Sequence, residues 1–80
     1  MPKLNRKFGV PLHHQISAVL KDGIATGRYQ AGERLPTEDG LCTLFSVSRI
    51  TVRRAMQSLE EQGLIERRQA KLERFEHVVI

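Results

Sequence analysis

Two short helical patterns lie almost end to end in the middle of this 80-residue chain. The first follows Thr37 and stops at Phe45, and the second starts from Ser48, so Ser46-Val47-Ser48 breaks the pattern. Serine is among the residues that cap helix N-termini, and the apolar Val47 lies inside the turn. Two helices this short, joined by so few residues, are typical of a helix-turn-helix. This break predicts that motif for residues 37–63.

The first helix of the pair has a clear start and an apolar face. Thr37 is a good N-cap, and the acids Glu38 and Asp39 lie in the first turn, where the helix dipole favours negative charge. Gly40 weakens the helix because glycine has a low helix propensity. The residues expected to be buried are Leu41, Leu44 and Phe45, with Cys42 as a small buried hydrophobe beside them.

The second helix carries its charges against its own dipole. Arg49, Arg53 and Arg54 occupy its N-terminal half and Glu60 and Glu61 its C-terminal end, whereas the dipole favours the reverse. No acid lies three or four residues from any of these arginines, so the helix itself offers them no partner. One interpretation is a solvated basic face, or one paired to acids on other elements. The other is that the missing anion is DNA, because guanidinium groups bind guanine edges and phosphates.

The residues around this pair predict the rest of the domain. The second helix ends at Gly63 and buries one face, made of Val52, Ala55, Met56 and Leu59. Pro11 opens an earlier helix that Gly27 closes. Its apolar face is Leu12, Ile16, Val19, Leu20 and Ile24. Gly23 in this helix indicates either a close backbone or fraying.

The last part of the chain predicts a β-hairpin. Residues 64–68 and 75–80 read as strands, and residues 33–35 could form a very short one. Two strands after a helix-turn-helix make a wing. We therefore expect an α+β fold, a winged helix-turn-helix with three helices followed by a β-hairpin wing over residues 64–80.

Length and charge limit the number of domains and the class of partner. Eighty residues allow one domain, for which we expect residues 10–80, preceded by a flexible, basic arm over residues 1–9. That arm is either a solvated tail or a segment that contacts phosphates. The excess of 13 Lys and Arg over 9 Asp and Glu suits a polyanionic partner. A single cysteine excludes an internal disulfide and a Cys-based zinc site. With no signal peptide or apolar stretch of ~20 residues, a cytoplasmic location is the default.

One stretch of the sequence resembles a known family. Gly32 to Gln69 reads GERLPTEDGLCTLFSVSRITVRRAMQSLEEQGLIERRQ. It resembles the DNA-binding domain of GntR-family transcriptional regulators, through LPTE, SVSRITVRRAM and GLI-x-R. The upstream PLHHQI at Pro11–Ile16 is similar to the opening of the HutC-like branch. The resemblance implies a repressor whose dimer binds a roughly palindromic DNA operator. It also implies a small-molecule effector that binds a domain outside these residues.

The resemblance also implies a set of contacts. Arg49 would read a base, and Ser48, Thr51 and Arg53 would meet phosphates or base edges. The whole predicted DNA-binding set is Ser48, Arg49, Thr51, Arg53, Arg54, Arg34, Thr37, Arg67, Arg68, Gln69 and Lys71. No catalytic residue, metal or cofactor is expected.

The chain departs from the family pattern in two places. Asp39 stands where the family often has an arginine on a phosphate. Ala70 and Leu72 replace two wing glycines, which puts the shape and DNA contact of the wing tip in doubt. These departures leave open a second hypothesis, a protein-interaction module that no longer reads DNA. An enzyme is disfavoured, because the adjacent His13 and His14 point to different faces of their helix. With His77 they form no nucleophile–base set or ligand cluster.

Overall fold

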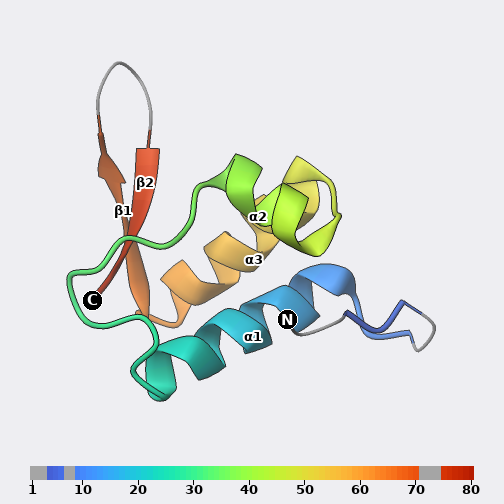
Figure 1. Ribbon diagram of the computed structural model, residues 1–80, viewed down its shortest axis with the longest axis horizontal. Coiled ribbons are helices and arrows are strands. Elements are labelled where there is room, and N and C mark those ends of the chain that lie inside the picture. The colour runs from blue at the N-terminus through green and yellow to red at the C-terminus, as the bar shows by residue number, and fades with distance from the viewer. Residues whose placement is uncertain (1–3, 7–8, 71–74) are drawn as a thin grey trace.

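The computed structural model describes residues 4–6, 9–70 and 75–80. In that part of the chain, three helices are followed by a two-stranded hairpin (Figure 1). The elements are α1 (Leu12–Ala25), α2 (Glu38–Phe45), α3 (Arg49–Glu61), β1 (Ile65–Gln69) and β2 (Phe75–Val79). The predicted winged helix-turn-helix is confirmed. Pro11 is the N-cap of α1, one position before the first helical residue where it was expected.

Side-chain caps fix the N-termini of both helices of the helix-turn-helix. The Thr37 hydroxyl accepts a hydrogen bond from the Gly40 amide at 3.0 Å, and the Ser48 hydroxyl accepts one from the Thr51 amide at 3.2 Å. Each bond satisfies an amide that the first turn of a helix leaves unpaired. Ser46 ends α2 in the left-handed conformation, at φ 55°. The chain therefore changes direction at the break that the sequence predicts.

The core lies where the three helices meet the base of the hairpin. The largest fully buried side chains are Ile16, Leu20, Leu41, Val52, Met56, Leu59 and Ile65. The expected face of α3 is confirmed, since Ala55 is buried as well. The expected face of α2 is partly wrong: Leu41 and Phe45 are buried, but Leu44 is 38% exposed. Cys42 is half-buried rather than buried.

Gly23 is buried against an aromatic ring, whereas the sequence indicated either a close backbone or fraying of the helix. A Cβ placed on Gly23 would lie 2.9 Å from two ring carbons of Tyr29. The Tyr29 amide donates to the Gly23 carbonyl at 3.1 Å, which holds the ring over the helix. The glycine thus makes room for a side chain that covers the end of α1.

The hairpin is extended by the connector before α2. β1 and β2 are antiparallel, with a register from Ile65 opposite Val79 to Gln69 opposite Phe75. On the other edge of β2, Arg34 bridges Val78, and the Leu35 amide donates to the His77 carbonyl at 2.9 Å. The very short strand expected at residues 33–35 is therefore confirmed as a bridge. Residues 71–74, with Lys71 and Leu72 of the expected wing tip, lie outside the described residues.

The described part of the N-terminal arm contacts α1 and the turn. The Gln15 side chain donates to the carbonyls of Asn5 at 2.6 Å and Val10 at 2.9 Å. The Arg6 guanidinium donates to the carbonyls of Phe45 at 2.9 Å and Ser46 at 2.8 Å. Arg6 therefore covers carbonyls at the C-terminal end of α2. The flexibility of the arm stays a prediction.

None of the helices in the described ranges is both long and apolar enough to cross a membrane.

Candidate nucleic-acid interface

The face of α3 that points away from the core is basic at its N-terminal half. Arg49, Arg53 and Arg54 are all exposed there, while Val52, Ala55 and Met56 on the core-facing side are buried. The hairpin rises beside the other end of the helix (Figure 1). The structure thus places Arg49 and Arg53 one turn apart, both within reach of acids at the start of α2, with Arg54 exposed next to Arg53.

Two hydroxyls lie at the start of this surface. The Ser48 hydroxyl is 2.9 Å from that of Thr51, besides accepting from the Thr51 amide. Ser48 is exposed and Thr51 half-buried. They stand at a helix N-terminus, where free amides and the dipole favour an anion. The two predicted residues, Ser48 and Thr51, are therefore in contact, and within the protein they cap the N-terminus of α3.

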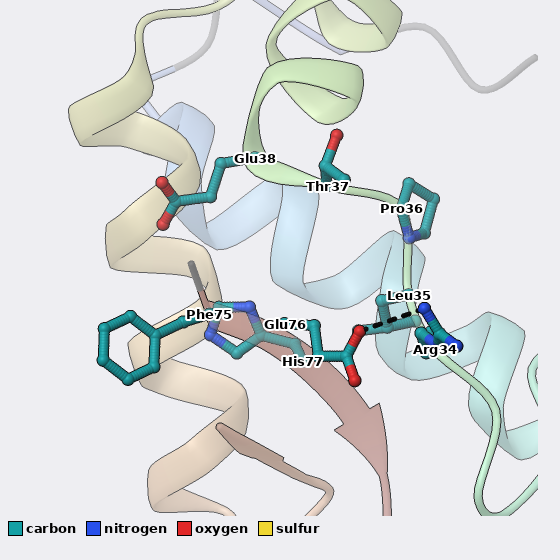
Figure 2. A pocket seen from close by; sticks show the side chains of 8 residues that line it. All are labelled: Arg34, Leu35, Pro36, Thr37, Glu38, Phe75, Glu76 and His77. Carbon is teal, nitrogen blue, oxygen red and sulfur yellow. Dashed lines mark ion pairs between the residues drawn. The ribbon is translucent and has the colours of Figure 1, made fainter. Parts of the chain in front are cut away.

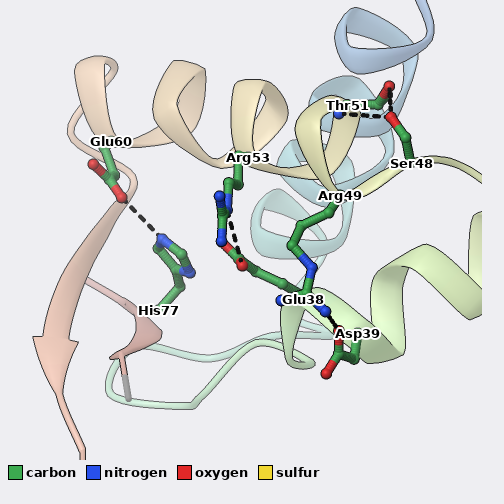
Figure 3. Close-up of polar contacts among 8 residues, drawn as sticks. All are labelled: Glu38, Asp39, Ser48, Arg49, Thr51, Arg53, Glu60 and His77. Atoms are coloured by element: carbon green, nitrogen blue, oxygen red, sulfur yellow. Dashed lines mark hydrogen bonds and ion pairs between the residues drawn. The ribbon is translucent and has the colours of Figure 1, made fainter. Parts of the chain in front are cut away.

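Two of the three arginines have acidic partners, and these lie on α2. The Arg53 Nε is 3.2 Å from a carboxylate oxygen of Glu38, and Arg49 forms an ion pair with Asp39 (Figure 3). The pairing to acids on other elements that was weighed for the basic face is therefore observed for Arg49 and Arg53. Arg54 forms no ion pair with any residue in the described ranges.

The exposure of these ion pairs to water determines how easily a bound anion could displace the carboxylates. The side chains of Arg49 and Asp39 are 53% and 75% exposed, and that of Arg53 is 60% exposed. Ion pairs this open to water contribute about 0–1 kcal/mol. A phosphate or a guanine edge can therefore replace or join the carboxylates at small cost.

Two further predicted residues lie at the start of α2 and before it. Arg34 forms an ion pair with Glu76 of β2 at 3.3 Å, and its side chain is 74% exposed. Thr37 caps α2. Both border a small open hollow of about 100 Å³ between the connector and β2 (Figure 2). The lining is Arg34, Leu35, Pro36, Thr37, Glu38, Phe75, Glu76 and His77. Within the described ranges no group of His, Cys, Asp and Glu could hold a metal.

The predicted wing residues form their own contacts. The Arg67 guanidinium lies 3.8 Å above the centroid of the exposed Phe75 ring, a cation–π arrangement. Arg68 pairs with Glu66 of the same strand, and Gln69 is exposed at the end of β1. The hairpin thus carries two exposed arginines, which lie on opposite faces of β1 because successive side chains of a strand alternate. Lys71 lies outside the described residues.

A polar link between the hairpin and α3 was missed by the sequence reasoning. The ring of His77 is buried, and its Nε2 is 2.9 Å from a carboxylate oxygen of Glu60 (Figure 3). His77 had been weighed only as an acid–base or metal candidate. The one available signal was its place in a strand, which says nothing of a partner 17 residues away in the chain.

Comparison with known proteins places these features in context. The family model "Bacterial regulatory proteins, gntR family" matches residues 12–71. The chain is 44% identical over 68 residues to an uncharacterised HTH-type transcriptional regulator, YurK of Bacillus subtilis, covering 85% of this chain and 28% of YurK. It is 47% identical over 60 residues to a probable fructoselysine utilization operon transcriptional repressor of Escherichia coli, covering 75% and 25%. The chain therefore spans about a quarter of the length of these curated relatives.

The chain also has the fold of a domain whose structure was solved in complex with DNA. The DNA-binding domain of AraR, determined with operator ORX1, superimposes with a TM-score of 0.82 and 28% sequence identity. The match covers all of this chain and 92% of that one.

Proposed function

The chain belongs to the GntR family of bacterial regulatory proteins, and from that premise we propose that it binds double-stranded DNA in a sequence-specific way. It would do so as the DNA-binding domain of a transcriptional repressor. One observation carries the proposal: the N-terminal half of α3 presents three exposed arginines, and the Ser48 and Thr51 hydroxyls lie at its start. An α-helix with such a face fits the major groove, where arginine recognises guanine.

The relatives support the finer parts of the proposal. The AraR domain was solved on an operator, and the E. coli relative is named as a repressor. The PLHHQI segment and that same relative support the HutC-like branch of the family. We infer that residues 10–80 form the DNA-binding domain and residues 1–9 an arm. Binding to the chromosome would place the protein in the cytoplasm.

The proposed contacts divide into base readout and phosphate contacts. Arg49 donates to a guanine, while Ser48, Thr51 and Arg53 meet phosphates or base edges. The remaining proposed contacts are made by Arg54, Arg34, Thr37, Arg67, Arg68, Gln69 and Lys71. A homodimer on a roughly palindromic operator, with a small-molecule effector bound to a further domain, completes the proposal.

A protein-interaction module is the second candidate. The observation that favours it is that Asp39 and Glu38 occupy two of the arginines that DNA would need. The exposure of both pairs weighs against it, because such pairs open at small cost.

Salt dependence tests the proposal. We expect a duplex selected from random sequences to bind the chain with log K falling by about 0.9 for each phosphate neutralised, or by about 3 to 4 per tenfold rise in salt for four contacts. Fluorescence anisotropy between low and moderate salt measures the slope, with a scrambled duplex of equal length as the control. An affinity that stays flat with salt, or equal affinities for the two duplexes, contradicts the proposal.

A further inference from the structure

Asp39 places a carboxylate beside Arg49 on the proposed DNA surface. It lies in the first turn of α2, and the Arg49 side chain extends from α3 to it (Figure 3). Its side chain is 75% exposed, against 28% for Glu38 in the neighbouring pair with Arg53. Of these two acids, Asp39 is therefore the one more accessible to bound DNA.

The geometry leaves Arg49 free to bind DNA while it holds Asp39. The contact with Asp39 is made through Nη2 of the guanidinium. A guanidinium has five N–H donors in a fixed plane, and Nη2 carries two of them. One N–H of Nη2 therefore remains beside that of Nε or Nη1, which leaves one two-donor edge for a guanine. An arginine anchored in this way also has fewer rotamers to lose when it binds.

The charge of Asp39 acts differently on different DNA sequences. A carboxylate near the DNA backbone is repelled by phosphates at every sequence, because this electrostatic effect does not depend on the bases. Only a sequence with a guanine under Arg49 gains from the fixed guanidinium. The same side chain thus weakens non-specific binding and supports specific binding.

We propose that Asp39 is a specificity-determining residue, which orients Arg49 for guanine and disfavours binding to other sequences. The proposal rests on the proposed function, since it needs DNA at this face. It deepens that function by naming a guanine-containing base pair under Arg49 as the site on which discrimination depends.

The Asp39→Asn variant tests this. We expect its affinity for a mixed-sequence duplex to rise several-fold while its affinity for the selected duplex stays equal or falls, so that the ratio of the two drops about five- to tenfold. A repeated selection with the variant should show a weaker guanine preference at one position in each half-site. A purely structural role for Asp39 would leave that base preference unchanged.

Glu61→Gln is the matched control. Glu61 is exposed at the far end of α3 and forms no ion pair within the described ranges, so its replacement removes the same charge elsewhere. We expect equal, small gains for both duplexes. If Asp39→Asn also tightens both duplexes equally, or changes neither, Asp39 does not determine specificity. A wild-type chain whose affinity is flat with salt overturns the proposed function, and this inference with it, before any variant is measured.

Discussion

Replacing Arg49 with alanine is expected to remove the preference for one base pair and to weaken binding to the selected duplex by about 5- to 150-fold. The reason is that a bidentate arginine–guanine contact contributes about 1–3 kcal/mol of discrimination. Arg49 is the predicted base reader, and it lies exposed in the first turn of α3. Competition with duplexes that differ at single positions measures the loss.

Arg53→Ala is the control for that experiment. Arg53 lies one turn further along the same face and is proposed to contact phosphate. Its removal should weaken all duplexes about evenly and reduce the salt slope by about one. The assignment of Arg49 as the base reader is wrong if Arg49→Ala also weakens every duplex evenly.

The second large effect is on folding. Leu41→Ala should lower the free energy of unfolding by about 2–5 kcal/mol, because Leu41 is fully buried and the short α2 has Phe45 as its other buried side chain. Small domains have only about 5–15 kcal/mol in total, so much of the stability would be lost. Urea denaturation followed by circular dichroism measures the change.

Leu44→Ala is the matched control, with the same substitution in the same helix. Leu44 is 38% exposed, so its truncation removes less buried apolar area than that of Leu41. The free energy of unfolding should therefore fall clearly less. Equal losses for the two variants would show that α2 is buried on a different face from the one described.

The exposed Leu44 shows where pattern reading reaches its limit in a short helix. Successive residues are about 100° apart, so Leu41 and Phe45 lie close together on the helix surface and Leu44 lies on the other side of Leu41. A helix of 8 residues contacts α3 along a narrow stripe, and an apolar residue at its edge remains exposed. The apolar face of α3 was predictable because it repeats over more turns. On α1, Ile16 and Leu20 of the predicted face are buried, and Val19 and Ile24 pack half-buried against the core.

The ion pairs of the interface were not predictable from the helix itself. Neighbour rules reach three or four residues along one helix, whereas Asp39 is 10 residues from Arg49, and Glu38 is 15 residues from Arg53. The turn at Ser46 brings the first turns of the two helices together, and this depends on tertiary packing. The same holds for Gly23 under Tyr29 and for His77 beside Glu60.

The caps were predictable because their chemistry is local. Thr37 and Ser48 each accept a bond from an amide three residues on, a distance that the sequence shows directly. The two caps and the break between them located the helix-turn-helix. The resemblance to a family then gave that motif its proposed partner.

The central claim is that the N-terminal half of α3 is the surface that meets DNA. Titration of the isotope-labelled chain with the selected duplex, followed by amide chemical shifts, tests it most directly. The largest shifts are predicted for Ser48 to Arg54, with small shifts for the exposed residues Ala18, Lys21 and Asp22 of α1. The claim is contradicted if residues 48–54 show no shift while the duplex binds, or if the shifts concentrate on α1.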